Sequence, residues 1–282
     1  MAKHEKEEIL DKNGAARVLM IGDVVGKPGR DVLIKRLQEI RSRFQIDFVI
    51  ANSENAAGGS GITPEIYNAI LRAGVDCVTL GDHAFRQKAI MPVLMSGDPR
   101  IVRPNNLSPA APGKGWTVLE IPASEERPAL KIGVAALIGR VFMNLPGDNP
   151  LFAADKLVEK FADTRVRFLD FHAEATSEKQ IMGRYLDGRW TAVLGTHTHV
   201  ATADEQIFPG GLAFQCDVGM TGPFESIIGR KVDCVLENFR TCRPTTFEVA
   251  SKDVRINGTF VDVDPVSGKA RAVRRLNFGA ED

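Results

Sequence analysis

The chain has 282 residues, of which 44% are hydrophobic and 26% are charged, a composition typical of a soluble globular protein with a sizeable core. Its 36 basic residues balance 36 acidic residues, which argues against a globally basic nucleic-acid binder but leaves room for a local basic site. No apolar stretch reaches the roughly 18 residues of a membrane helix and the charged N-terminal segment lacks the apolar part of a signal peptide, so we expect a cytoplasmic protein without membrane association.

The first third of the chain repeats the order strand, polar loop, helix. Continuous apolar runs predict buried strands, and apolar residues at helical spacing predict the helices between them. The predicted strands are 17–21, 48–51 and 77–80, and the predicted helices are 28–43 and 64–71. This alternation is typical of an α/β fold with a largely parallel sheet.

The rest of the chain adds further strands and changes character towards its end. Strands are predicted at 117–121, 130–137, 166–171 and 191–194, with a helix at 178–185. Segments 247–250, 253–264 and 270–276 resemble antiparallel strands, and residues 264–268 have the composition of a turn. No repeat, low-complexity segment or linker interrupts the chain. We therefore predict a polar tail over residues 1–14 and one α/β domain over residues 15–282, with a mixed or two-sheet core.

Residues of metal-ligand type directly follow five of the predicted strands. These residues are Asp23, Glu54 with Asn55, Asp82 with His83, His172, and His197 with His199. Because ligands of open α/β sheets bind beyond the carboxyl ends of the strands, we expect these side chains to share one site. Carboxylates and imidazoles without a thiolate suit Mn, Fe, Zn or Co.

Each of these residues has an ordinary structural explanation when taken alone. Asp23 and Asp82 could each cap a following helix, the latter beginning near Arg86, and Glu54 could be a surface acid. His172 could be a hydrogen-bonded core histidine. The combination is harder to explain without a site, since each of five strand ends would have to carry a residue of metal-ligand type by chance. In extended backbone His197 and His199 face the same side, so both could reach one metal pair.

Other motifs carry no comparable chemistry. Residues 22–28 echo a phosphate-binding loop, but the segment is one residue short and has Pro28 where Ser or Thr must bind magnesium. Residues 58–61 form a glycine-rich loop without a nucleophile elbow. The four cysteines are scattered without a CxxC pair, which argues against a disulfide framework and a thiolate zinc site.

The order of the candidate ligands, together with several local strings, resembles the YmdB-like branch of the calcineurin-like binuclear metallophosphoesterases. These strings are IGDVVGKPGR, NSENAAGGSGIT, RPNN, DFHAEATSEK, GTHTHVATAD and DVGMTGP. The resemblance runs from about Val18 to Asp264. It implies a four-layer αββα sandwich, two metal ions per chain, phosphodiesterase activity on 2′,3′- or 3′,5′-cyclic nucleotides, and a homo-oligomer, either dimer or tetramer. The metals it implies are Fe and Mn, with Zn, Mg and Co as alternatives.

The resemblance also implies a role for each residue at a matching position. Asp23 and His199 would hold the first metal. Glu54 would bridge the two metals, and Asp82, His172 and His197 would hold the second. Asn55 adds a metal ligand or touches the phosphate. A hydroxide shared by the metals would attack phosphorus, and His83 would give a proton to the leaving alkoxide or orient the phosphate.

Two residues depart from the branch. Asp82 stands where the branch usually has Asn, and Arg86 stands where it has Asp. The added carboxylate either favours a metal pair of higher charge or is offset by Arg86, which is within reach if a helix has begun; a solvated Arg86 is an equal alternative.

Residues farther from the metal ligands receive weaker assignments. Arg86, Asn105 and Arg140 are candidate substrate contacts, and Asp204 is a candidate acceptor that orients a histidine. Segment 217–222 forms either a wall of the cleft or an oligomer contact.

Two other functions remain compatible with the sequence. A phosphomonoesterase or nuclease would use the same metal centre on a different substrate. A regulatory or scaffold protein with a weakly active metal site would bind RNA or protein partners and is expected to have lost ligands. Every ligand position here holds a competent residue, so we favour a hydrolase acting on a small, RNA-derived or cyclic phosphodiester.

Overall fold

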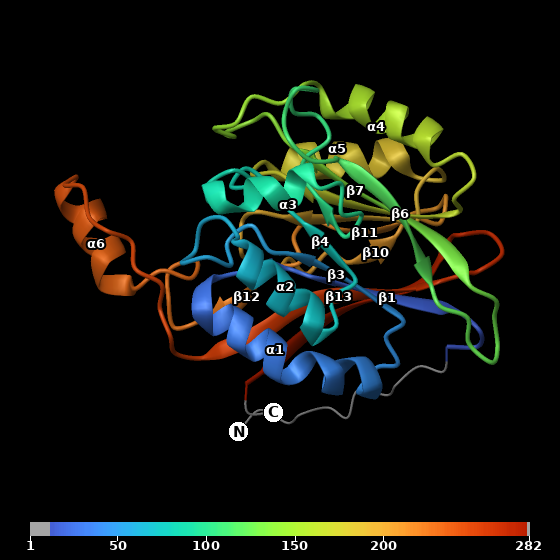
Figure 1. Cartoon of the computed structure of the whole chain (residues 1–282), viewed down its shortest axis with the longest axis horizontal. Coiled ribbons are helices and arrows are strands. Elements are labelled where there is room, and N and C mark those ends of the chain that lie inside the picture. Colours follow the sequence, from blue (N-terminus) through green and yellow to red (C-terminus); the bar gives the residue numbers. More distant parts are fainter. Residues whose placement is uncertain (1–11, 281–282) are drawn as a thin grey trace.

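In the computed structural model the apolar runs of the sequence form the strands of two stacked β-sheets (Figure 1). The structure describes residues 12–280. The eight-stranded first sheet has the order β2 (Asp23–Val24), β12 (Met220–Pro223), β13 (Val254–Val263), β1 (Ala16–Ile21), β3 (Phe48–Asn52), β4 (Cys77–Thr79) and β5 (Ile101–Val102), with β14 (Ala270–Gly279) paired to β13. The six-stranded second sheet has the order β10 (Gln206–Ile207), β11 (Ala213–Gln215), β9 (Ala192–Thr196), β8 (Val166–His172), β7 (Leu130–Ile138) and β6 (Trp116–Ile121).

Helices cover the outer face of each sheet. Helices α1 (Gly26–Arg43) and α2 (Pro64–Ala73) lie on the first sheet, and α4 (Pro150–Lys160) and α5 (Thr176–Leu186) lie on the second (Figure 1). The 3-10 turn η1 (Lys88–Ile90) leads into α3 (Met91–Met95), and α6 (Val232–Thr241) projects from the body. The layers therefore run helix, sheet, sheet, helix, which confirms the expected αββα sandwich.

The central strands β1, β3 and β9 are buried on both faces, which explains why they appear as continuous apolar runs. Along β1, Leu19 and Ile21 pack towards the helices, whereas Val18 and Met20 pack between the two sheets. The pairing is parallel between β1 and β3 and antiparallel between β1 and β13. In the second sheet β7, β8, β9 and β11 are parallel, so their carboxyl ends lie at one edge. The 3.1 Å contact between Glu54, which follows β3, and His172, which ends β8, places this edge beside the carboxyl edge of the first sheet.

Most predicted elements are present, with ends that differ by a few residues. The prediction of a strand at 247–250 is wrong, since this segment forms only an isolated bridge between Val249 and Arg230. The sequence analysis missed α4 although Asn149 caps it and Pro150 begins it. It also missed β11 and β12, which are too short to show a strand period.

Little of the predicted tail falls within the described residues. Of residues 1–14, the structure describes 12–14, where Lys12 Nζ pairs with Asp47 Oδ2 at 2.8 Å and the Gly14 amide donates to Glu126 Oε2 at 2.9 Å. The tail therefore stays a prediction. Across residues 12–280, no helix is both long and apolar enough to cross a membrane.

Candidate metal centre

The residues of metal-ligand type meet at the carboxyl edge, where the two sheets face each other. The first sheet supplies the carboxylates, with Asp23 in β2, Glu54 after β3 and Asp82 after β4. The second sheet supplies the imidazoles, with His172 at the end of β8 and His197 and His199 after β9. The Asp23 carboxylate also accepts the backbone N–H of His197 at 3.1 Å, which ties the two sheets together.

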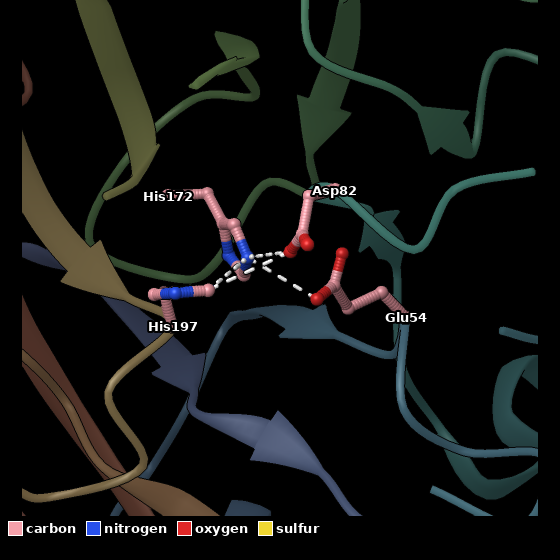
Figure 2. A group of neighbouring side chains, drawn as sticks. All are labelled: Glu54, Asp82, His172 and His197. Carbon is pink, nitrogen blue, oxygen red and sulfur yellow. Dashed lines mark hydrogen bonds and ion pairs between the residues drawn. The ribbon is translucent and has the colours of Figure 1, made fainter. Parts of the chain in front are cut away.

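Four of these side chains point at one another (Figure 2). His172 Nε2 lies 3.1 Å from Glu54 Oε1, 3.0 Å from Asp82 Oδ1 and 3.0 Å from His197 Nδ1. One ligand atom from each of the four residues lies within 4.8 Å of all the others. Burial alone would raise the pKa of Glu54 and of Asp82, but the facing His172 lowers both, so the two carboxylates are ionised. Such a donor set is suited to a metal cation.

The hydrogen bonds behind His172 direct its Nε2 towards the carboxylates of the site. Thr196 Oγ1 donates to Asp170 Oδ1 at 2.6 Å and therefore accepts the Nδ1–H of His172 at 2.8 Å. Burial raises the pKa of Asp170 to about 6, so it is an ionised acceptor at neutral pH. This arrangement fixes Nδ1 as a donor and points Nε2 at the carboxylates. Burial lowers the pKa of His172, but Glu54 and Asp82 outweigh it and raise that pKa well above its usual value, so a metal would replace the proton on Nε2.

His197 is oriented by a carboxylate that the sequence analysis did not single out. Its Nε2 lies 3.2 Å from Glu174 Oε2, so Nε2–H is the donor and Nδ1 faces the site. The prediction that Asp204 has such a role is wrong, because the Asp204 carboxylate instead accepts from Gln180 and from the backbone of Cys216. The signal available in the sequence was the position of Glu174 in the polar loop that follows His172.

A second group of acceptors lies beside the first. His199 Nδ1–H donates to the Ile228 carbonyl at 2.9 Å, which leaves Nε2 as an acceptor, 3.7 Å from Asp23 Oδ1. The Asn55 amide nitrogen lies 3.2 Å from His199 Nε2, 3.3 Å from Asp23 Oδ1 and 3.5 Å from Glu54 Oε1. This –NH₂ group thus lies among three acceptors that could equally coordinate a cation. The Asn55 amide oxygen is turned away and accepts from His83 Nδ1 at 2.7 Å.

The two histidines after β9 do not lie in extended backbone, so the expectation that they share one face is wrong. His197 has φ 101° and His199 has φ 65°, both in the left-handed region that is costly for side chains other than glycine. As a result His197 turns to the four-residue cluster and His199 turns to Asp23.

A buried ion pair holds this turn in place. Asp217 Oδ2 accepts from the backbone N–H of Thr198 at 3.0 Å, from its hydroxyl at 2.8 Å and from Lys179 Nζ at 2.8 Å. The Gly219 amide donates to Asp217 Oδ1 at 2.8 Å, and both charged side chains are almost completely buried. Asp217 therefore anchors the turn between the two histidines, a role that the sequence analysis did not foresee for segment 217–222.

His83 lies at the rim of the site. Its backbone N–H donates to Glu54 Oε2 at 3.0 Å, and its Nε2 is 3.8 Å from Asp82 Oδ2. Gly81, at the start of the same turn, packs directly on His172, where an added Cβ would lie 2.3 Å from the imidazole ring. Only glycine fits this position without displacing His172.

The structure also tests the ordinary explanations for the two aspartates. Helix α1 is preceded by Val25 and has no side-chain cap, so Asp23 does not cap it. Residues 82–85 form a turn and no helix begins at Arg86. Arg86 is exposed, and among the ion pairs of residues 12–280 none joins it to Asp82, so the proposed charge compensation is wrong.

The candidate substrate contacts lie farther out. Asn105 lines a cavity of about 450 Å³ together with Arg103, Asn106 and Lys156. Arg140 is exposed, and its backbone N–H donates to Glu178 Oε1 at 2.9 Å. The contacts of the described residues do not bring either side chain to the four-residue cluster.

The chain is similar in sequence and in structure to known proteins. A family model described as "YmdB-like protein" matches residues 19–276. The chain is 41% identical over 261 residues to the 2′,3′-cyclic-nucleotide 2′-phosphodiesterase of Bacillus subtilis, a match that covers 92% of this chain and 96% of that protein. The crystal structure of a novel phosphatase from Mycoplasma pneumoniae superimposes with a TM-score of 0.86 at 34% identity, covering 94% of both chains.

More distant structures share the fold alone. A 5′-nucleotidase precursor from Thermus thermophilus matches with a TM-score of 0.52 at 12% identity, over 95% of this chain and 55% of that one. The sandwich is thus shared with a protein of much lower sequence identity.

Proposed function

Because this chain belongs to the YmdB-like family, we propose that it is a metal-dependent phosphodiesterase that hydrolyses cyclic nucleotides of the 2′,3′ form, the 3′,5′ form or both. The observation that carries the proposal is the convergence of Glu54, Asp82, His172 and His197 on one point at the carboxyl edge. The Bacillus subtilis relative, which is 41% identical, supports the choice of a phosphodiester substrate.

We propose two metal positions. Asp23 and His199 would hold the first, Glu54 would be shared, and Asp82, His172 and His197 would hold the second, with Asn55 beside both. A donor set of carboxylates and imidazoles favours Fe or Mn, with Zn, Mg and Co as alternatives. When bound, such ions supply Lewis acidity, which neutralises charge on phosphoryl oxygens and makes water a stronger nucleophile.

The residues of the chain would position the substrate and move a proton. His83 gives its Nδ1–H to Asn55, so Nε2 is the atom that would hold a proton and pass it to the leaving alkoxide. Because the Asn55 amide also contacts Asp23 and Glu54, it would hold His83 in a fixed position relative to these carboxylates. Thr196 and Glu174 would keep the two imidazoles of the second position aligned.

The setting of the reaction is also a proposal. We place the protein in the cytoplasm as a homo-oligomer that acts on a small phosphodiester, including one derived from RNA. The alternative is a phosphomonoesterase, which is supported by the Mycoplasma pneumoniae relative described as a phosphatase.

The test combines metal analysis with a substrate panel. Protein purified without chelator is analysed for metal content and assayed with bis-p-nitrophenyl phosphate, 2′,3′-cAMP, 3′,5′-cAMP and p-nitrophenyl phosphate. We expect about two metals per chain and turnover of the diesters, both diminished in His197→Ala. Turnover of the monoester alone would favour a phosphatase. Absence of metal and of turnover after addition of Mn²⁺ or Fe²⁺ would reject the enzyme and favour a scaffold.

A further inference from the structure

A cavity of about 280 Å³ lies at the amino edge of the second sheet, opposite to the candidate metal centre. Within the part of the chain that the structure describes, its wall has no acidic side chain but four basic ones, which are Arg165, Arg167, Arg189 and Lys269. Arg167 lies near the start of β8 and His172 at its end, five residues or about 17 Å apart along the strand. The cavity is therefore separate from the metal ligands.

Two distant segments of the chain bring these cations together. Gly268, in the turn between β13 and β14, has φ 74°, and an added Cβ would lie 2.3 Å from the backbone oxygen of Arg165. The turn thus packs directly against the segment that precedes β8. Thr191 Oγ1 also donates to the Gly268 carbonyl at 2.7 Å, which fixes the turn to the segment that precedes β9. Lys269 follows Gly268 and so lines the same cavity as Arg165.

Three of the four cations have no carboxylate partner. Arg189 pairs with Asp155 at 2.8 Å. Arg167 donates to three backbone carbonyls at 2.6 to 2.9 Å and Arg165 donates to one at 2.6 Å, but neutral carbonyls do not offset a charge. Within residues 12–280, no ion pair joins Arg165, Arg167 or Lys269 to an acid. Burial lowers the pKa of Arg167, as expected for a cation without a facing carboxylate.

The wall also contains a buried hydrogen-bond donor without an acceptor. Trp190 is 4% exposed and lines the cavity. Among the described residues its Nε1–H has no hydrogen-bond partner. Because buried donors are normally paired, an unpaired one in a cavity wall calls for an acceptor oxygen from a ligand.

The charge and the size of the cavity indicate the class of ligand. Guanidinium, ammonium and indole N–H groups all donate to phosphate oxygens, and arginine does so with two parallel hydrogen bonds. Three uncompensated positive charges exceed the charge of one phosphate monoester, which is about −1.5 to −2 at neutral pH. A volume of about 280 Å³ is at the lower end for small-molecule pockets, so the ligand is small as well as multiply charged.

We propose that this basic cavity binds a small anion with two linked phosphate groups, such as inorganic pyrophosphate or the diphosphate part of a nucleotide. Arg165, Arg167 and Lys269 hold the phosphate oxygens, and the Trp190 indole N–H donates to one of them. A wall with one sign of charge also concentrates anions near the cavity. The site shares no residue with the proposed metal positions, so it can be present or absent whatever the outcome for phosphodiesterase activity.

The first experiment measures binding of inorganic pyrophosphate by titration calorimetry. The double variant Arg165→Gln, Lys269→Gln should raise the dissociation constant by about 100-fold, since two charge-assisted contacts are lost. The matched control is Arg72→Gln, Lys35→Gln, which removes one arginine and one lysine that are exposed on other elements. The control should bind like wild type, and both variants should keep the wild-type melting temperature. A double variant that binds like wild type would overturn the proposal.

The second experiment locates the bound anion. Pyrophosphate also coordinates metal ions, so each titration is repeated in the His197→Ala background, which is expected to hold less metal. Binding and its loss in the double variant should persist there; binding that disappears in His197→Ala would assign pyrophosphate to the metal centre and overturn the proposal. The chain has two tryptophans, so Trp116→Phe leaves Trp190 alone, and pyrophosphate should change its fluorescence emission. An unchanged emission spectrum at saturation would refute the indole contact.

The third experiment tests the class of ligand. ADP should bind with an affinity similar to that of pyrophosphate, because both carry two linked phosphates, and orthophosphate should bind about tenfold more weakly. Equal affinity for orthophosphate would overturn the two-phosphate ligand. Binding of an RNA oligonucleotide without binding of pyrophosphate would overturn the proposal in favour of a nucleic-acid surface.

Discussion

The buried pair of Lys179 and Asp217 allows a sharp test of how the metal centre is held in shape. Substituting Lys179→Met removes the cation with little change in side-chain volume. The Asp217 carboxylate then stays buried with the donors from Thr198 and Gly219 but without a counter-charge. Since this carboxylate anchors the turn that carries His197 and His199, the substitution should disturb both stability and metal binding.

The contacts of Asp217 determine how much stability Lys179→Met should lose. Removing one partner of a buried ion pair costs about 3–5 kcal/mol. Three remaining hydrogen bonds to Asp217 place the expected loss near the lower end, about 3 kcal/mol, or roughly 6–12 °C in melting temperature for a domain of this size. The loss of alignment behind two metal-ligand histidines should weaken metal affinity by about 10–100-fold.

The assay pairs thermal unfolding with metal titration, and a second buried ion pair provides the control. Arg17 Nε lies 2.5 Å from Asp262 Oδ1, with both side chains buried, and joins β1 to β13 away from the metal ligands. Arg17→Met should cost similar stability and leave metal affinity unchanged. If Lys179→Met lowers the melting temperature while its metal affinity matches that of Arg17→Met, the pair supports the fold without positioning the histidines.

Three further predictions concern the site itself. His83→Ala should keep its metal and lose turnover by about 10²–10⁴-fold; loss of metal in this variant would contradict a proton-transfer role. Glu174→Ala should weaken metal binding at His197 by about tenfold or more, whereas Glu174→Gln, which keeps an acceptor oxygen, should lose less; equal titration curves would refute the orienting contact. Chelation should lower the melting temperature, because it leaves buried carboxylates such as Glu54 facing Asp82, and calorimetry with and without EDTA measures the difference.

Strand positions were predictable because burial on both faces leaves a continuous apolar run. That run made the ends of β1, β3, β4, β8 and β9 visible, and hence the gathering of carboxylates and imidazoles at one edge. Helix α6 was not predicted, although its apolar residues recur at helical spacing. Strands of two or three residues, such as β2 and β11, are set by pairing with distant segments.

The finer geometry of the site depends on contacts between distant residues. Extended backbone was the natural expectation for residues 197–199, and the left-handed conformation exists because Asp217 binds Thr198 from another loop. Whether Asp204 or Glu174 is the acceptor that orients a histidine depends on the direction of two loops, which local sequence does not encode. The pairing of Asp82 with histidines instead of Arg86 likewise follows from how the sheets meet.

The division of the ligands between the sheets has a consequence for how the protein matures. A folding intermediate with only the first sheet formed holds carboxylates such as Asp23, and one with only the second holds imidazoles such as His172, so neither offers the complete donor set. A metal ion would thus act as a removable cross-link across the sandwich interior, one whose strength is set by free metal concentration. Scarcity of metal would then lower the free energy of unfolding, and proteolysis of the unfolded chain would become faster.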